Sequence, residues 1–152
     1  MTPKEYLSQA FRIDQRINSK LEQIMSLREL AAKATTTLSG TPSKKTRNVH
    51  SMGDIISKMM DLENEINEDI DYLIDLKKEI VSFIKGIRNT EHQTLLELRY
   101  LCFKTWEQIA VDMGYDLRYI HKIHGRSLEH CERILKRTLK DTEGHFDRVV
   151  VP

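Results

Sequence analysis

The sequence predicts an all-α protein in which long N-terminal helices form a coiled-coil-like hairpin or dimer and shorter helices follow. Three observations support this fold class. Only 6 of the 152 residues are glycine and 3 are proline, too few for a β-fold that depends on many turns. Lys, Glu, Leu, Ile and Arg dominate, as they do in long amphipathic helices. Apolar residues also repeat every seven positions over residues 52–87, which is typical of a coiled coil.

The first expected helix begins at Thr2 and Pro3, because threonine favours the position before a helix and proline favours its first turn. Apolar residues then recur at alternating steps of three and four. This spacing predicts one long helix with a single buried stripe, ending near residues 33–35. Asp14 and Arg28 are the polar residues that interrupt the stripe. Its apolar members are Leu7, Ala10, Ile17, Leu21, Ile24 and Ala31.

Residues 35–53 are expected to form a mobile linker. The stretch is rich in Ser, Thr, Gly and Pro and has no periodic apolar pattern, and a connection of this length is unusual inside a compact domain. Its cations Lys44, Lys45 and Arg47 could contact phosphate, but a solvated loop is the favoured interpretation.

The second long helix is expected to begin near Asp54 and to carry the seven-residue repeat, which only Asp69 interrupts. A stripe this narrow buries too little surface by itself, so it needs a partner: the first helix of the same chain or a second copy of the protein. In a homodimer, two first helices packed antiparallel about Leu21 would set Asp14 opposite Arg28, and this charge pair could fix their orientation. The apolar members of the repeat are Met52, Ile55, Met59, Leu62, Ile66, Leu73, Leu76, Ile80, Phe83 and Ile87.

Charge is unevenly distributed along the chain, although the formal net charge is only +1. Acidic residues lead over 54–79 and basic residues over 118–140, which predicts an acidic body and a basic working end. Cys102 and Cys131 lie among apolar neighbours without a CxxC pattern, so both are expected to be reduced core residues. No apolar run approaches the roughly 20 residues that span a bilayer, so a soluble, cytoplasmic protein without membrane contact is expected.

Residues 89–140 have the pattern of three further helices. Thr90 can cap the first of them, and Thr105 with Gln108 forms a capping box for the second. The first helix carries Leu95, Leu96, Leu98, Tyr100 and Leu101, and the buried face of the second is Trp106, Ile109, Ala110 and Met113.

Gly114 is expected to adopt a left-handed turn after the second of these helices, and Asp116 to cap the third. Tyr115, between them, should direct its ring toward the core. The inner face of the third helix is expected to be Ile120, Ile123, Leu128 and Cys131 or Leu135. Two short helices joined by a sharp glycine turn are the pattern of a helix-turn-helix, and the helix before them supplies a third wall.

If Ile120 and Ile123 face inwards, the first two turns of the last helix present four other side chains to solvent. Those turns meet base edges when a helix-turn-helix docks in the major groove of double-stranded DNA. Arginine can pair with guanine through two hydrogen bonds, lysine can reach guanine or phosphate, and an apolar side chain can contact a thymine methyl group. The four candidate base-contacting residues are Leu117, Arg118, His121 and Lys122.

Further candidates are suited to phosphate rather than to bases. Thr105 stands at a helix start, where backbone N–H groups favour anions. Arg126 and the later bases Arg133, Lys136 and Arg137 lie further along the last helix, where only the DNA backbone would be within reach.

Several residues have other interpretations. A glycine between two amphipathic helices also occurs in helical hairpins that bind nothing. His121 and His124, three residues apart, could resemble a metal-binding pair, but no third ligand shares their outer face. Trp106 is interpreted as a packing anchor rather than a stacking platform. The sequence has no nucleophile–base pattern, phosphate-binding glycine loop or cofactor motif, so neither an enzyme nor a cofactor or metal site is expected.

Residues 95–135 resemble the fourth conserved region of bacterial sigma factors, a helix-turn-helix that contacts promoter DNA. The likeness rests on Leu98-Arg99-Tyr100, Thr105-x-x-Gln108-Ile109-Ala110, Gly114-Tyr115, Ile120-x-x-Ile123-His124 and Arg126-Ser127-Leu128. It covers about a quarter of the chain, and the other sigma regions are not found. The resemblance implies that residues 117–122 form the base-reading helix. Asp116, Leu117 and Tyr119 differ from the Ser and Arg more usual in the family, so the family's DNA site is not carried over.

The whole layout is also similar to small phage regulators of Gram-positive hosts, including ArpU-like and RinA-like activators of late genes. This resemblance implies a phage-encoded transcription regulator acting on late or packaging genes in the bacterial cytoplasm. Residues 1–88 would then form an oligomerisation region of a homodimer that could contact host RNA polymerase, residues 89–140 the DNA-binding domain, and residues 141–152 a tail.

Two other functions remain open. A DNA-packaging recognition subunit, similar to a small terminase, would use the same parts as a ring, and a helical scaffold would not bind DNA. The sequence leaves two alternatives for the tail. Val149 to Val151 could add a short strand or pack on a neighbour, or the tail could be disordered.

Overall fold

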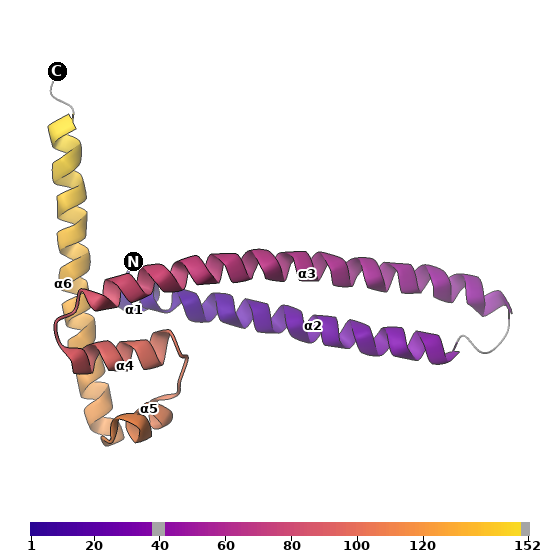
Figure 1. Ribbon diagram of the computed structural model, residues 1–152, viewed down its shortest axis with the longest axis horizontal. Helices are drawn as coiled ribbons and strands as arrows, with labels where there is room; N and C mark the ends of the chain where they lie inside the picture. Colours follow the sequence, from indigo (N-terminus) through magenta and orange to yellow (C-terminus); the bar gives the residue numbers. More distant parts are fainter. Residues whose placement is uncertain (38–41, 150–152) are drawn as a thin grey trace. The chain divides into compact units, whose positions relative to one another are not determined.

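The computed structural model describes the backbone of residues 1–37 and 42–149 and the side chains of residues 1–35 and 52–142. Every secondary-structure element in these residues is a helix (Figure 1), so the all-α prediction is confirmed. Among the described residues, none of the helices combines the length and the apolar content needed to cross a lipid bilayer. In chain order the helices are α1 (Pro3–Leu7), α2 (Gln9–Thr37), α3 (Pro42–Lys85), α4 (Thr90–Tyr100), α5 (Trp106–Met113) and α6 (Leu117–Val149).

Contacts group the chain into two compact units. One unit contains Met1–Phe11 and Leu76–Pro152, and the other contains Arg12–Asp75. The first unit therefore combines α1 and the end of α3 with α4, α5 and α6, the helices expected to form the DNA-binding domain.

The predicted helix start at Thr2 is confirmed, but the helix is interrupted after one turn. The Thr2 hydroxyl accepts a hydrogen bond from the Glu5 N–H at 3.2 Å, and the Glu5 carboxylate accepts one from the Thr2 N–H at 2.9 Å. Ser8 ends α1: its N–H still donates to the Lys4 carbonyl at 3.0 Å and its dihedral angles stay right-handed (φ −76°, ψ −7°), and α2 begins at the next residue. The Tyr6 hydroxyl donates to Glu79 at 3.0 Å, which joins α1 to the end of α3.

Within the unit Arg12–Asp75, α2 and α3 run side by side as an antiparallel pair (Figure 1). The repeat of α3 faces α2: Leu62 and Ile66 are buried there, as are Ile17 and Ile24 of α2. The partner of the α3 stripe in this structure is therefore the first long helix of the same chain, one of the two expected alternatives.

The stripe of α2 differs from the prediction at its centre. Leu21 was expected inside, but its side chain is 45% exposed, and Lys20 takes the inner position instead. The Lys20 ammonium lies 2.6 Å from the carboxylate of Asp69, the residue that interrupts the α3 repeat, and Arg16 lies 3.4 Å from the same group. A leucine in the place of Lys20 would leave the nearly buried Asp69 carboxylate without its closest partner. This explains why a lysine occupies the inner position.

The expected linker at residues 35–53 is shorter in the structure. α2 continues to Thr37 and α3 begins at Pro42, ahead of the predicted start near Asp54. Proline suits a first helical turn, and no other proline or glycine follows before Gly53, so the Lys- and Arg-containing stretch can continue as helix. Residues 38–41 of the expected linker lie outside the described residues, as do the side chains of Lys44, Lys45 and Arg47.

The core of the other unit lies where α4, α5 and α6 meet. The residue before α4 that caps it is Asn89, not Thr90 as predicted, because the Asn89 side chain accepts the N–H groups of Glu91 and His92. The fully buried apolar side chains of these three helices are Leu95, Leu96, Ile109, Ile120 and Cys131.

The two cysteines differ in environment. Cys131 is buried in the core as predicted, and this burial raises the pKa of its thiol to about 11. The prediction for Cys102 was wrong: it is exposed, because it follows the last turn of α4 and lies in the connection to α5.

Phe103, in the connection between α4 and α5, has the left-handed backbone angle φ 57°, which a residue with a side chain adopts at a cost of about 1–2 kcal/mol. Its ring packs against Phe11 at 5.5 Å between centroids, and the Lys77 ammonium lies 4.7 Å from its centre. These contacts compensate for the strain and hold the connection before α5 against the first turn of α2 and the end of α3.

The last helix extends beyond the residues that the sequence assigned to it. α6 runs for 33 residues, from Leu117 to Val149, and includes most of the expected tail. Residues 150–152, and with them the end of the Val149–Val151 segment, lie outside the described residues.

Candidate nucleic-acid interface

The connection from α5 to α6 is fixed by local hydrogen bonds. The predicted capping box is confirmed: Thr105 accepts the Gln108 N–H at 3.3 Å, and Gln108 accepts the Thr105 N–H at 3.0 Å. Gly114 has φ 73°, the left-handed turn that the sequence predicted. Asp116 then accepts the N–H of Tyr119 at 2.7 Å, which caps α6 as predicted. These features set the direction in which α6 leaves the turn.

The inner face of α6 fixes its rotation about its own axis. Ile120 and Ile123 are buried as predicted, and Ser127, further along the same face, donates its hydroxyl hydrogen bond to the Ile123 carbonyl at 2.8 Å. Leu128 and Leu135 are half-buried at the edge of this face. The opposite face must therefore point away from the core.

An aromatic cluster attaches α6 to its neighbours. The His124 ring is 9% exposed, its Nε2 atom lies 2.7 Å from the Tyr100 hydroxyl, and the Trp106 ring packs edge-on against it at 4.5 Å. Burial lowers the pKa of His124 to about 4, so the ring is neutral near pH 7. The Arg99 guanidinium stacks over Trp106 at 4.3 Å from its centre. Trp106 is thus a packing anchor, as predicted.

The six main candidates for DNA contact all have exposed side chains. One of them lies at the start of α5 and the others lie in the first three turns of α6. The His121 ring lies 5.0 Å from Trp106, which restricts its orientation while leaving it accessible. The six residues are Thr105, Leu117, Arg118, His121, Lys122 and Arg126.

The cations of α6 are arranged along its first turns. Arg118, Lys122 and Arg126 follow at steps of four, so they span about 12 Å of helix, close to the width of a DNA major groove of about 12 Å. The exposed acids Glu129 and Glu132 come next, and Glu132 lies 3.2 Å from Lys136. Residues 117–126 of α6 therefore carry exposed cations that pair with no acid among the described residues, and the Glu132 pairing makes Lys136 a weaker candidate for a phosphate contact than the sequence predicted.

Gly125 is a feature of this face that the sequence analysis did not assign. It lies two turns after Arg118 on the same side of α6 and is exposed. A Cβ atom at Gly125 would meet nothing within 4 Å, so no packing among the described residues requires a glycine there. Because glycine in a helix interior costs about 1 kcal/mol relative to alanine, a close approach from outside is a physical reason for it. A glycine seven residues after Arg118 was a signal visible in the sequence.

Tyr115 was predicted to turn toward the core, and that prediction was wrong. Its side chain is 41% exposed and packs edge-on against Tyr119 at 4.7 Å. The nearby Glu91 carboxylate of α4 raises the pKa of the Tyr115 hydroxyl. The two tyrosines instead form an exposed aromatic pair beside the first turn of α6.

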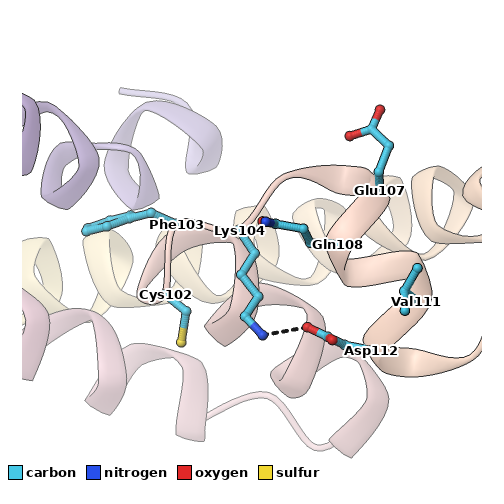
Figure 2. A pocket seen from close by; sticks show the side chains of 7 residues that line it. All are labelled: Cys102, Phe103, Lys104, Glu107, Gln108, Val111 and Asp112. Atoms are coloured by element: carbon cyan, nitrogen blue, oxygen red, sulfur yellow. Dashed lines mark hydrogen bonds and ion pairs between the residues drawn. The ribbon is translucent and has the colours of Figure 1, made fainter.

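The outer side of α5 differs in charge from α6. Figure 2 shows a shallow hollow there, with the Lys104 ammonium and the Asp112 carboxylate joined at 2.5 Å. Their contact leaves Glu107 as the remaining charge among the residues that line the hollow, and Val111 beside it is 81% exposed. This side is unsuited to phosphate, so DNA would meet the unit through α6 and the start of α5.

Comparison of the chain with protein-family models, with curated proteins and with solved structures finds no match.

Proposed function

We propose that this chain is a sequence-specific DNA-binding regulator of transcription rather than an enzyme. In this proposal α5, the turn at Gly114 and α6 form a helix-turn-helix similar to the fourth conserved region of sigma factors. α6 enters the major groove, and the paired helices α2 and α3 supply the coiled-coil-like oligomerisation region. The resemblance to phage late-gene activators supports a phage-encoded protein that acts on late or packaging genes and that could contact host RNA polymerase.

The exposed cationic face of α6 carries this proposal. Buried Ile120 and Ile123 hold the helix, while Arg118, Lys122 and Arg126 project from the other side over about one groove width. A helix-turn-helix needs this division, since the inner residues fix the angle at which the outer ones meet base edges.

The residues have different roles in the proposed complex. Arg118, in the first turn of α6, would pair with guanine through two hydrogen bonds, and Lys122 one turn later would reach guanine or phosphate. His121, held against Trp106, would donate to a base acceptor. Thr105, whose hydroxyl already accepts the Gln108 N–H, retains its own hydrogen to donate to phosphate. Gly125 would let the DNA backbone approach α6 closely.

Selection of bound duplexes from a random-sequence pool, using the full chain, tests the proposal. A sequence-specific protein enriches one short motif and binds it on the order of 10³-fold or more tightly than unrelated DNA at physiological salt. Affinity should also fall with salt, with a slope of about −0.9 for each phosphate contact. Binding that is tight for no sequence, or equal for all sequences, contradicts the proposal.

Native mass separates regulation from packaging. A dimer that binds a two-part site is expected of the regulator, whereas a closed ring of many copies would favour the packaging subunit. Absence of any salt-dependent DNA binding would instead favour the scaffold.

A further inference from the structure

The pair of helices in the unit Arg12–Asp75 has a second apolar surface in addition to the one buried between α2 and α3. Large apolar side chains of both helices are exposed: Leu21 is 45% exposed, Met25 62% and Ile56 50%. We define the outer apolar face as Leu21 and Met25 of α2 with Ile56, Met60, Ile70 and Ile74 of α3.

The six residues lie on one side of the helix pair. A shallow groove on the other side is lined by Ser19, Gln23 and Leu27 of α2 together with Lys58 and Leu62 of α3. Each helix has a buried stripe that faces the other helix, and the groove residues lie to one side of that stripe. On a helical wheel at 100° per residue, Leu21 and Met25 lie on the other side of the α2 stripe, and the four α3 residues lie on the other side of the α3 stripe. Because the groove residues of both helices lie on one face of the helix pair, the residues on the other side of each stripe share the opposite face.

The charges on this face match those of a second copy of itself. Asp14 and Arg28 lie on the same flank of α2 as Leu21, each seven residues from it. When two such helices cross antiparallel at Leu21, the Asp14 of each copy meets the Arg28 of the other, because a two-fold axis through Leu21 exchanges the two positions. Two identical ion pairs then flank an apolar centre.

The size of the face also suits self-association. Over residues 56–74 it is about 27 Å long, and two helices packed 8–10 Å apart make it about 20 Å wide. Each copy would bury on the order of 500 Å², so a pair would bury about 1,000 Å², the lower size expected of a specific interface.

We propose that the outer apolar face binds a second copy of this chain, with α2 antiparallel to α2 of the partner about Leu21, so that four helices form one bundle. This inference rests on the unit Arg12–Asp75 alone and does not depend on DNA binding.

Sedimentation of the full chain at micromolar concentrations tests this interface. The expected mass is twice the 17.8 kDa of one chain. Leu21→Asp should give monomer with unchanged helix content by circular dichroism, because Leu21 lies outside the buried stripe. Leu30→Asp is the matched control: Leu30 is 50% exposed on the groove side of α2, and its replacement should leave the dimer intact.

Charge reversal tests the antiparallel register. Asp14→Arg and Arg28→Asp should each weaken the dimer about tenfold or more, because each places two pairs of like charges across the axis. The double variant, Asp14→Arg with Arg28→Asp, should return to within about threefold of the original dimer constant. A monomeric natural chain, an assembly larger than two, equal effects of Leu21→Asp and Leu30→Asp, or a double variant as weak as the single ones would each overturn the proposal.

Discussion

Replacing His124 with glutamine should remove part of the acid sensitivity of the core formed by α4, α5 and α6. Burial, assisted by the nearby cations Lys4 and Arg99, lowers the pKa of His124 from 6.5 to about 4. The unfolded chain therefore binds a proton more readily than the folded chain below about pH 6.5. The stability that His124 contributes is fully present above that pH and is lost as the pH falls toward 4.

The size of the effect follows from the two pKa values. At pH 5 the difference between 6.5 and about 4 corresponds to about 2 kcal/mol of lost stability, and partial solvent screening reduces this to about 1–2 kcal/mol. Glutamine can still exchange a hydrogen bond with the Tyr100 hydroxyl, but it does not titrate.

Urea unfolding of the natural chain and of His124→Gln at about pH 7.5 and about pH 5 measures this difference. The natural chain should lose about 1–2 kcal/mol more than the variant between the two conditions. Burial also lowers the pKa of His92, but this residue is present in both proteins and cancels in the comparison. Equal losses in the two proteins would refute the assignment of His124 as a buried neutral residue.

Three further substitutions test other parts of the account. Gly125→Ala should stabilise the chain to urea by about 0.5–1 kcal/mol, since its Cβ meets nothing, yet weaken DNA binding; unchanged affinity would remove Gly125 from the interface. Gly114→Ala should destabilise it by about 1–2 kcal/mol because of the left-handed angle, and a neutral result would contradict that geometry. Asp69→Ala should lower the unfolding free energy by about 1–3 kcal/mol by leaving Lys20 without its closest partner, whereas exposed Asp71→Ala should not.

Local features of this fold could be predicted from the sequence, because they depend on residues only a few positions apart. The capping box of Thr105 and Gln108 and the left-handed turn at Gly114 are of this kind. The exposure of Arg118 and Lys122 also follows from local spacing, once Ile120 and Ile123 are placed inside.

Features that depend on distant residues were missed. Lys20 looks like a surface residue until Asp69, far along the chain, is seen opposite it, and this pair shifts Leu21 outwards. Tyr115 packs against Tyr119, and its hydroxyl lies near Glu91 of another helix, instead of turning toward the core. Periodicity alone identifies neither Asp69 as the neighbour of Lys20 nor Glu91 as the neighbour of Tyr115.

The affinity of Arg118→Ala for its selected duplex and for a scrambled duplex tests the central claim most directly. Arg137→Ala is the matched control, since Arg137 is exposed on the same helix but lies about 28 Å from Arg118. Arg118→Ala should weaken binding to the selected site by about 1–3 kcal/mol, roughly 10- to 100-fold, and relax one base preference, with less effect on the scrambled duplex. Arg137→Ala should weaken both duplexes alike and only slightly. An equal effect of Arg118→Ala on both duplexes, or no effect, would contradict base reading by α6.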